Sequence, residues 1–264
     1  MEPSPARVQS VSLEQKNRVA RLTIQRPPLN VLDIPAIREL RDRLVGLWDD
    51  KTVYTAARLV EIRGSGEKAF SAGVEIRDHF PERAAEMLNE FHALIRSVLR
   101  APCPMVAIVR GNCLGGGMEL ALACDFILAA EDASFGLPEI RVGAFPPVAS
   151  VLLPRLIPEK KALEMILTGE GIGAQEAARL GLVNLVASID DFDAEVARFE
   201  EKLLARSPAV MAMALRAVRM RRLEGFELAL RETERIYLQE LLPTKDATEG
   251  LQAFVERRSP RWEP

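Results

Sequence analysis

The sequence has the length and composition of a globular protein with a large hydrophobic core. It has 264 residues, of which 48% are hydrophobic and 28% are charged, a balance unlike that of disordered or fibrous chains. The formal net charge of −3 gives no general attraction to nucleic acid or to anionic lipid. The sequence contains no run of about 18 apolar residues, so it predicts no membrane span, and the first residues lack the apolar stretch of a secretory signal. We therefore expect a cytoplasmic protein that binds neither nucleic acid nor membrane.

The cysteines predict neither a disulfide framework nor a metal site. Cys103, Cys113 and Cys124 lie in apolar segments and lack CxxC spacing. Cysteine is among the residue types most often buried. We therefore expect free thiols in the core, a reducing compartment and no bound metal.

Strand and helix signals alternate along the first part of the chain. Residues 18–24 alternate in the manner of a strand, and an apolar helical face follows between Ile37 and Leu47. The same pairing recurs several times, which predicts an α/β architecture. The expected strands cover residues 18–24, 59–62, 105–109, 126–130 and 182–186, and the other expected helices begin near residues 81, 116 and 174.

Strand signals stop near Asp190, and the rest of the chain reads as helices. Breaks at Ser207-Pro208, Gly225 and Pro243 separate them. We therefore divide the chain into a core of residues 1–205 and a helical region of residues 206–264. Apolar residues of this region either pack back on the core or meet another subunit. The expected helices cover residues 194–206, 208–222, 226–242 and 246–257.

Two glutamates stand in apolar surroundings. Glu119 follows the triplet Gly115-Gly116-Gly117 and opens an apolar run. The glycines allow close backbone approach, and the helix that begins there points unpaired N–H groups toward negative charge. Glu139 lies twenty positions further on, at a predicted turn after Pro138. Two carboxylates in one pocket would suit proton transfer.

A second loop adds backbone donors. Ala72-Gly73-Val74 follows the strand and turn at 59–66 and keeps the backbone uncluttered. Together with the glycine triplet it offers two loops with exposed N–H groups. Two converging N–H donors are what an oxyanion hole needs.

These segments resemble the crotonase (enoyl-CoA hydratase/isomerase) superfamily. The likeness is carried by residues 70–75, 111–125 and 135–140, in that order, and continues in residues 167–170, 174–183 and 249–258. The resemblance implies a spiral of ββα units followed by a helical trimerisation region. It also implies a homotrimer or homohexamer, in which we expect Ile236, Leu238 and Leu241 to lie between subunits.

The resemblance also assigns roles to residues of the site. The oxyanion donors fall on the backbone N–H groups of Val74 and Gly116, and Glu119 and Glu139 match the acids of the family's hydratases. The implied ligand is an acyl-CoA thioester, so coenzyme A enters as part of the substrate and no prosthetic group is expected.

Coenzyme A would lie along two segments, mostly through backbone groups. By the resemblance these are Ala72 to Val74 and the segment that contains Pro28 and Leu29. The lysine or arginine that meets the phosphates cannot be read from the sequence.

Family membership alone does not fix the reaction, because one fold serves many chemistries. Both glutamates favour hydration of an enoyl-CoA. The alternatives are an enoyl-CoA isomerase, in which one glutamate moves the proton, and a non-catalytic acyl-CoA-binding subunit. Residues 71–79, Phe91-His92 and 145–149 further resemble cyclohexa-1,5-dienecarbonyl-CoA hydratases. Pro146-Pro147 stand where many hydratases have a glycine-rich segment, and these stiffer residues predict a compact or cyclic acyl group.

Two other features have simpler interpretations. His79 and His92 are the only histidines, and we expect them to have packing or surface roles. Arg216, Arg219, Arg221 and Arg222 are expected to form a solvated helix face or a salt bridge between subunits.

Overall fold

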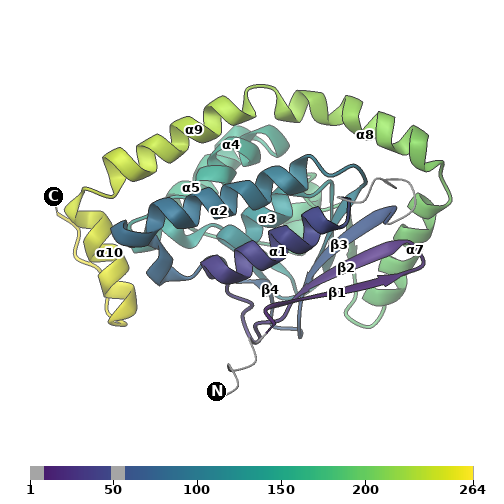
Figure 1. Cartoon of the computed structure of the whole chain (residues 1–264). Coiled ribbons are helices and arrows are strands. Elements are labelled where there is room, and N and C mark those ends of the chain that lie inside the picture. Colours follow the sequence, from purple (N-terminus) through teal and green to yellow (C-terminus); the bar gives the residue numbers. More distant parts are fainter. Residues whose placement is uncertain (1–8, 49–56, 264) are drawn as a thin grey trace, which may run out of the picture.

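The computed structural model describes residues 9–48 and 57–263 and has two sheets (Figure 1). The larger sheet has the strand order β1-β2-β3-β5-β7-β10, and the smaller has the order β4-β6-β8-β9. The larger sheet contains β1 (Val11–Lys16), β2 (Val19–Ile24), β3 (Leu59–Gly64), β5 (Met105–Val109), β7 (Phe126–Ala130) and β10 (Leu185–Ala187). The smaller contains β4 (Ala69–Ser71), β6 (Asn112–Leu114), β8 (Ser134–Gly136) and β9 (Ile172–Gly173).

Helices cover the sheets and form most of the C-terminal part. In chain order they are α1 (Ile34–Gly46), η1 (Ile76–His79), α2 (Pro81–Leu99), α3 (Gly116–Ala123), η2 (Pro138–Val142), α4 (Pro147–Leu156), α5 (Glu159–Thr168), α6 (Ala174–Arg179), α7 (Phe192–Leu204), α8 (Pro208–Leu223), α9 (Phe226–Arg235), the π-helical η3 (Ile236–Leu241) and α10 (Lys245–Val255). No helix in the described part of the chain is long and apolar enough to cross a membrane.

Three successive units build a spiral. The units β3-β4-α2, β5-β6-α3 and β7-β8-α4 each give one strand to each sheet before their main helix. Within the larger sheet β2, β3, β5, β7 and β10 pair in parallel, while β1 is antiparallel to β2. In the smaller sheet β4, β6 and β8 are parallel. The expected α/β spiral is therefore confirmed.

The core fills the space between the larger sheet and the helices. Every residue of α3 is buried, whereas α2 buries one apolar stripe that includes Phe91, Ile95 and Val98. A helix buried all round needs no polar face, which explains why α3 is almost wholly apolar. The expected free, buried thiols are confirmed for all three cysteines.

The strand expected at residues 182–186 begins later, at Leu185. The backbone N–H groups of Leu182 and Val183 both donate to the carbonyl of Ala177, at 2.9 and 3.3 Å. These residues therefore close the end of α6 and cannot join the sheet.

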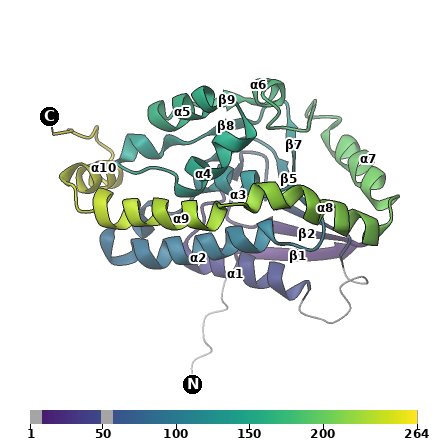
Figure 2. The same cartoon turned by 90° about the horizontal axis from the view of Figure 1, so that it is seen from above.

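The C-terminal helices lie on the core of their own chain. Figures 1 and 2 show α8 and α9 running as an arch over α2, α3 and α4. Phe226 and Leu230 of α9 are buried in the main core. Leu238 and Leu241 pack, half-buried, against a second cluster that includes Ile34 and Met87. These two leucines therefore contact their own chain. Like Ile236 they are only half-buried, so the expected place of all three residues between subunits stays a prediction. The division between residues 205 and 206 stays a prediction.

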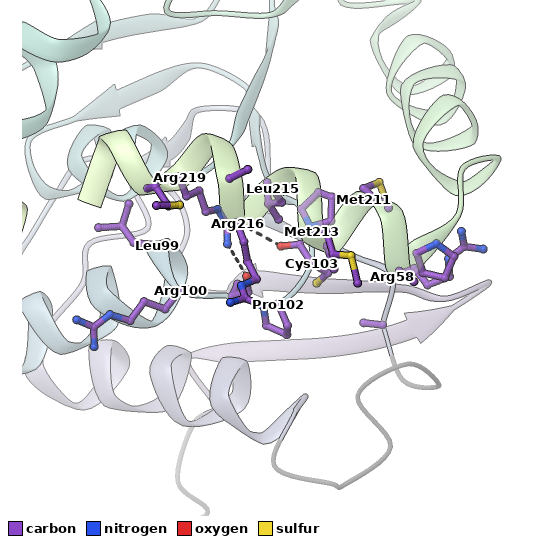
Figure 3. A pocket seen from close by; sticks show the side chains of 18 of the residues that line it. Arg58, Leu99, Arg100, Pro102, Cys103, Met211, Met213, Leu215, Arg216 and Arg219 are labelled. Carbon is purple, nitrogen blue, oxygen red and sulfur yellow. Dashed lines mark hydrogen bonds between the residues drawn. The ribbon is translucent and has the colours of Figure 1, made fainter. Parts of the chain in front are cut away.

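One arginine of α8, Arg219, corrects an expectation. Arg219 is only 5% exposed, and its guanidinium donates to the carbonyl of Cys103 at 3.3 Å (Figure 3). The guanidinium also pairs with Asp125. Asp125 also accepts from the backbone N–H of Met105 at 2.8 Å. Arg219 therefore fastens α8 to the start of β5, whereas Arg216 is exposed as expected. A buried arginine needs such pairing because an unpaired charge in the core is costly.

Candidate active site

The candidate site lies where three parallel strands of the smaller sheet end. The loop 72–74 follows β4, α3 follows β6, and η2 follows β8. Because parallel strands end at the same edge of a sheet, these three segments converge there. The spiral thus brings together residues that are 65 positions apart, from Val74 to Glu139.

Glycines allow α3 to approach the loop closely. A Cβ on Gly117 would lie 2.4 Å from the carbonyl oxygen of Ser71, and one on Gly116 would lie 2.8 Å from Cγ2 of Val74. Such separations are shorter than any normal contact. Gly117 therefore admits no side chain without movement of the backbone, and Gly116 admits none without movement of Val74. Gly73 has a φ of +103°, which other residues rarely adopt.

Two backbone donors meet at this contact. A Cβ on Gly116 would lie 3.4 Å from the backbone nitrogen of Val74, so the two segments are adjacent. Neither the N–H of Val74 nor that of Gly116 donates a hydrogen bond within residues 9–48 and 57–263. Gly116 is the first residue of α3, where N–H groups have no acceptor inside the helix. Both donors are available to an oxygen of a bound ligand.

Glu119 lies in the first turns of α3 and is buried, with 4% exposure. Its Oε1 accepts a hydrogen bond from the backbone N–H of Ala149 at 2.8 Å. Ala149 lies in the first turn of α4, which begins at Pro147, and proline is favoured at that position. Burial raises the pKa of Glu119 to about 7, although hydrogen bonds from the backbone of Ala149 and Val148 oppose the rise.

Glu139 comes from η2 and faces the same cavity. Its Oε2 is buried and has no hydrogen-bond partner among the described residues. Burial, and then the charge of Glu119, raise the pKa of Glu139 to about 8. Each carboxylate therefore disfavours ionisation of the other, and the pair tends to hold one proton near neutral pH.

One cavity of 520 Å³ contains nearly all the residues expected from the sequence. Leu29, Ala72, Val74, Gly116, Glu119 and Glu139 line it. Pro28 does not; it lines a neighbouring hollow of 610 Å³ together with Arg26. Leu29 and Val31 line both spaces, so the two are adjacent.

The walls of the cavity are mostly apolar. Phe91, Met87 and Leu88 come from α2, and Phe145 and Pro146 precede α4. The proline segment thus has two roles in the structure. It forms a wall of the cavity, and it begins α4, in which the N–H of Ala149 donates to Glu119.

Two lining residues were not expected in the site. His79 ends η1 and Tyr237 lies in η3, and His79 Nδ1 lies 2.8 Å from the hydroxyl oxygen of Tyr237. These residues are 158 positions apart, so no local pattern could connect them. His92, by contrast, is fully buried in α2, as a packing role predicts, with its Nδ1 3.3 Å from Oε1 of Glu234.

Comparison with known proteins identifies the family. The enoyl-CoA hydratase/isomerase family model matches residues 14–264. The chain is 37% identical over 254 residues to a cyclohexa-1,5-dienecarbonyl-CoA hydratase of Thauera aromatica, covering 96% of each protein. It is 36% identical over 264 residues to a probable enoyl-CoA hydratase of Bacillus subtilis, covering 96% of this chain and 98% of the relative.

A solved structure has the same fold. An enoyl-CoA hydratase from Mycobacterium avium subsp. paratuberculosis superposes with a TM-score of 0.86 at 32% identity, over 97% of this chain and 99% of the other. The family match and the likeness in fold extend over nearly the whole sequence. The chain therefore belongs to the enoyl-CoA hydratase/isomerase family.

Proposed function

We propose that the protein is an enoyl-CoA hydratase that uses Glu119 and Glu139 with an oxyanion hole formed by the N–H groups of Val74 and Gly116. The thioester carbonyl oxygen would accept from both N–H groups and become the oxygen of an enolate. Losing one such donor costs about 3 kcal/mol of transition-state stabilisation in comparable sites. No prosthetic group is needed, and coenzyme A enters as part of the substrate.

The glutamates divide the work of hydration. The ionised carboxylate takes a proton from a water molecule while the oxygen of that water bonds to C3. The protonated carboxyl gives a proton to C2. The pair then again holds one proton, so the sum of charges is unchanged. The observation that carries the proposal is two buried carboxylates with raised pKa values in one cavity, beside two N–H groups that donate no hydrogen bond in the part of the chain that the structure describes.

The test is turnover of linear, branched and cyclic enoyl-CoA thioesters in deuterium- and oxygen-18-labelled water. Hydration puts deuterium on C2 and an oxygen-18 hydroxyl on C3. A shifted double bond with no hydroxyl would instead identify an isomerase. Binding of thioesters without any product would identify a non-catalytic subunit.

We also propose that the preferred acyl group is compact. It would have either few carbons beyond the double bond or a ring. The aromatic and proline walls beside Glu139 support this, as does the relative named cyclohexa-1,5-dienecarbonyl-CoA hydratase. Coenzyme A would extend over Ala72 and Leu29 to Pro28 and Arg26, whose guanidinium suits phosphate. Replacing Arg26 by alanine should raise KM for the thioester with little change in kcat.

The protein is also proposed to form a homotrimer or homohexamer, with α8 in the interface. Its apolar side chains Val210, Met213, Val218 and Met220 are 66 to 75% exposed in the single chain. Apolar surface of this kind commonly marks a subunit contact. Analytical ultracentrifugation at micromolar concentration should find no stable monomer, and replacing Val218 by glutamate should weaken the assembly.

A further inference from the structure

A polar pair interrupts the apolar wall of the cavity. The side chain of Tyr237 is 1% exposed and packs against Phe145, with 5.4 Å between ring centroids. It belongs to a cluster with Ile34, Met87 and Leu88. Its hydroxyl is paired with His79 at 2.8 Å. A phenol and an imidazole in such surroundings need hydrogen bonds to offset their desolvation.

The hydrogen bond to His79 leaves the hydroxyl of Tyr237 with spare capacity. A phenolic hydroxyl offers one donor and also accepts, and His79 Nδ1 uses only one of these. Burial lowers the pKa of His79 to about 4, so its ring is neutral at physiological pH. Burial, with the charges of Glu139 and Glu119, raises the pKa of Tyr237, so the phenol stays protonated.

The charge in the cavity determines which of His79 and Tyr237 donates in this hydrogen bond. The two glutamates make the cavity negative, and an O–H dipole is most stable with its hydrogen toward negative charge. Nδ1–H of His79 then donates to the phenol oxygen, and the phenol O–H of Tyr237 faces the cavity. The assignment of the tautomer follows from this argument.

A buried acceptor lies in the same cavity. Oε2 of Glu139 has no partner among the described side chains and backbone groups. A hydroxyl group held between Tyr237 and Glu139 would accept from the first and donate to the second. A purely hydrocarbon group there would leave both polar groups unsatisfied, which is costly in a buried site.

We propose that Tyr237, positioned by His79, is a specificity-determining residue that hydrogen-bonds a hydroxyl group carried by the acyl part of the thioester. The pocket accordingly prefers hydroxyacyl-CoA thioesters to acyl-CoA thioesters of the same carbon skeleton. This inference rests on the proposed function for the acyl-CoA site.

The test uses two ligands that differ by one hydroxyl, pivaloyl-CoA and 3-hydroxypivaloyl-CoA. Neither has a hydrogen on C2, so neither can lose water during the measurement. Calorimetry on the wild-type protein should show about five- to tenfold tighter binding of the hydroxylated ligand, as one buried hydrogen bond predicts. In Tyr237→Phe the ratio should fall by about threefold or more, as the loss of one hydrogen bond predicts, although the glutamates can still bind the C3 hydroxyl. The Kd of pivaloyl-CoA should change less than about twofold, since the ring still packs on Phe145.

His79 variants separate positioning from packing. His79→Asn keeps an N–H near the place of Nδ1 and should retain most of the discrimination. His79→Leu keeps bulk without the donor and should lose it. A merely structural role for His79 would weaken both ligands equally in both variants.

The outcomes distinguish this inference from the function on which it rests. Equal binding of the two ligands by the wild-type protein, or an unchanged ratio in Tyr237→Phe, would overturn the role of Tyr237 and leave the acyl-CoA site standing. Failure of the wild-type protein to bind either thioester would overturn the acyl-CoA site itself.

Discussion

Replacing Glu139 by glutamine should stabilise the protein at alkaline pH. Burial raises the pKa of Glu139 from its usual 4.5 to about 8, and the unfolded chain returns it to its usual value. Between these pH values the folded state binds more protons than the unfolded state, so stability falls as pH rises. Glutamine has nearly the same shape and does not titrate. The variant should therefore escape this loss.

The size of this stabilisation follows from the difference between the two pKa values of Glu139. A rise from 4.5 to about 8 corresponds to at most about 5 kcal/mol at pH values above 8. Water can enter the cavity that Glu139 faces, and the titration of Glu139 is coupled to that of Glu119. We therefore expect Glu139→Gln to gain only about 2 to 3 kcal/mol in free energy of unfolding. For a chain of this length that is a rise in Tm of about 4 to 10 °C.

The assay is urea and thermal unfolding of wild type and Glu139→Gln at pH 8.5 and pH 4.5. The gain should be present at pH 8.5 and nearly absent at pH 4.5. Glu67→Gln is the matched control, because Glu67 is exposed in the turn between β3 and β4; it should show no such dependence. A Glu139→Gln protein that is less stable than wild type at pH 8.5 would refute the reasoning.

Three further outcomes test the site. Glu119→Gln and Glu139→Gln should each lower kcat about 10²-fold or more with little change in thioester binding, and full activity in either would remove the two-carboxylate assignment. Wild-type kcat/KM should peak between pH about 7 and about 8, falling below that range as the base is protonated and above it as the acid ionises; a flat profile from pH 6 to 9 would contradict this. Compact enoyl-CoA thioesters should exceed a C10 enoyl-CoA in kcat/KM by about tenfold, or 1.4 kcal/mol, and a preference for the C10 ester would reverse the substrate proposal.

The sequence predicts the larger elements, and it predicts that Glu119 and Glu139 share one pocket. A long periodic signal identifies α2, and continuous apolar runs identify the buried strands β5 and β7. Local patterns do not reveal the strands of the smaller sheet, since β4, β6 and β8 have three residues each. Strands so short show no alternation, and their pairing depends on partners far along the chain.

Some residues of the candidate site can be predicted from local sequence and others cannot. Glu119 and its glycines have a local signal, because a carboxylate in an apolar run and adjacent glycines are unusual. Tyr237 and His79 do not, because each is ordinary in its own helix. Arg219 looked like a surface residue for a similar reason: its partner Asp125 lies 94 positions earlier. Tertiary contacts of this kind leave no pattern in neighbouring residues.

The wide spacing of the lining residues also has a consequence for how the protein is made. Val74, Glu119 and Glu139 come from successive turns of the spiral, and Tyr237 reaches the cavity only from η3. During synthesis the early turns can fold as they leave the ribosome. The cavity nevertheless stays open on one side until η3 has emerged and docked. A nascent chain can thus hold both glutamates in place well before it can enclose an acyl group.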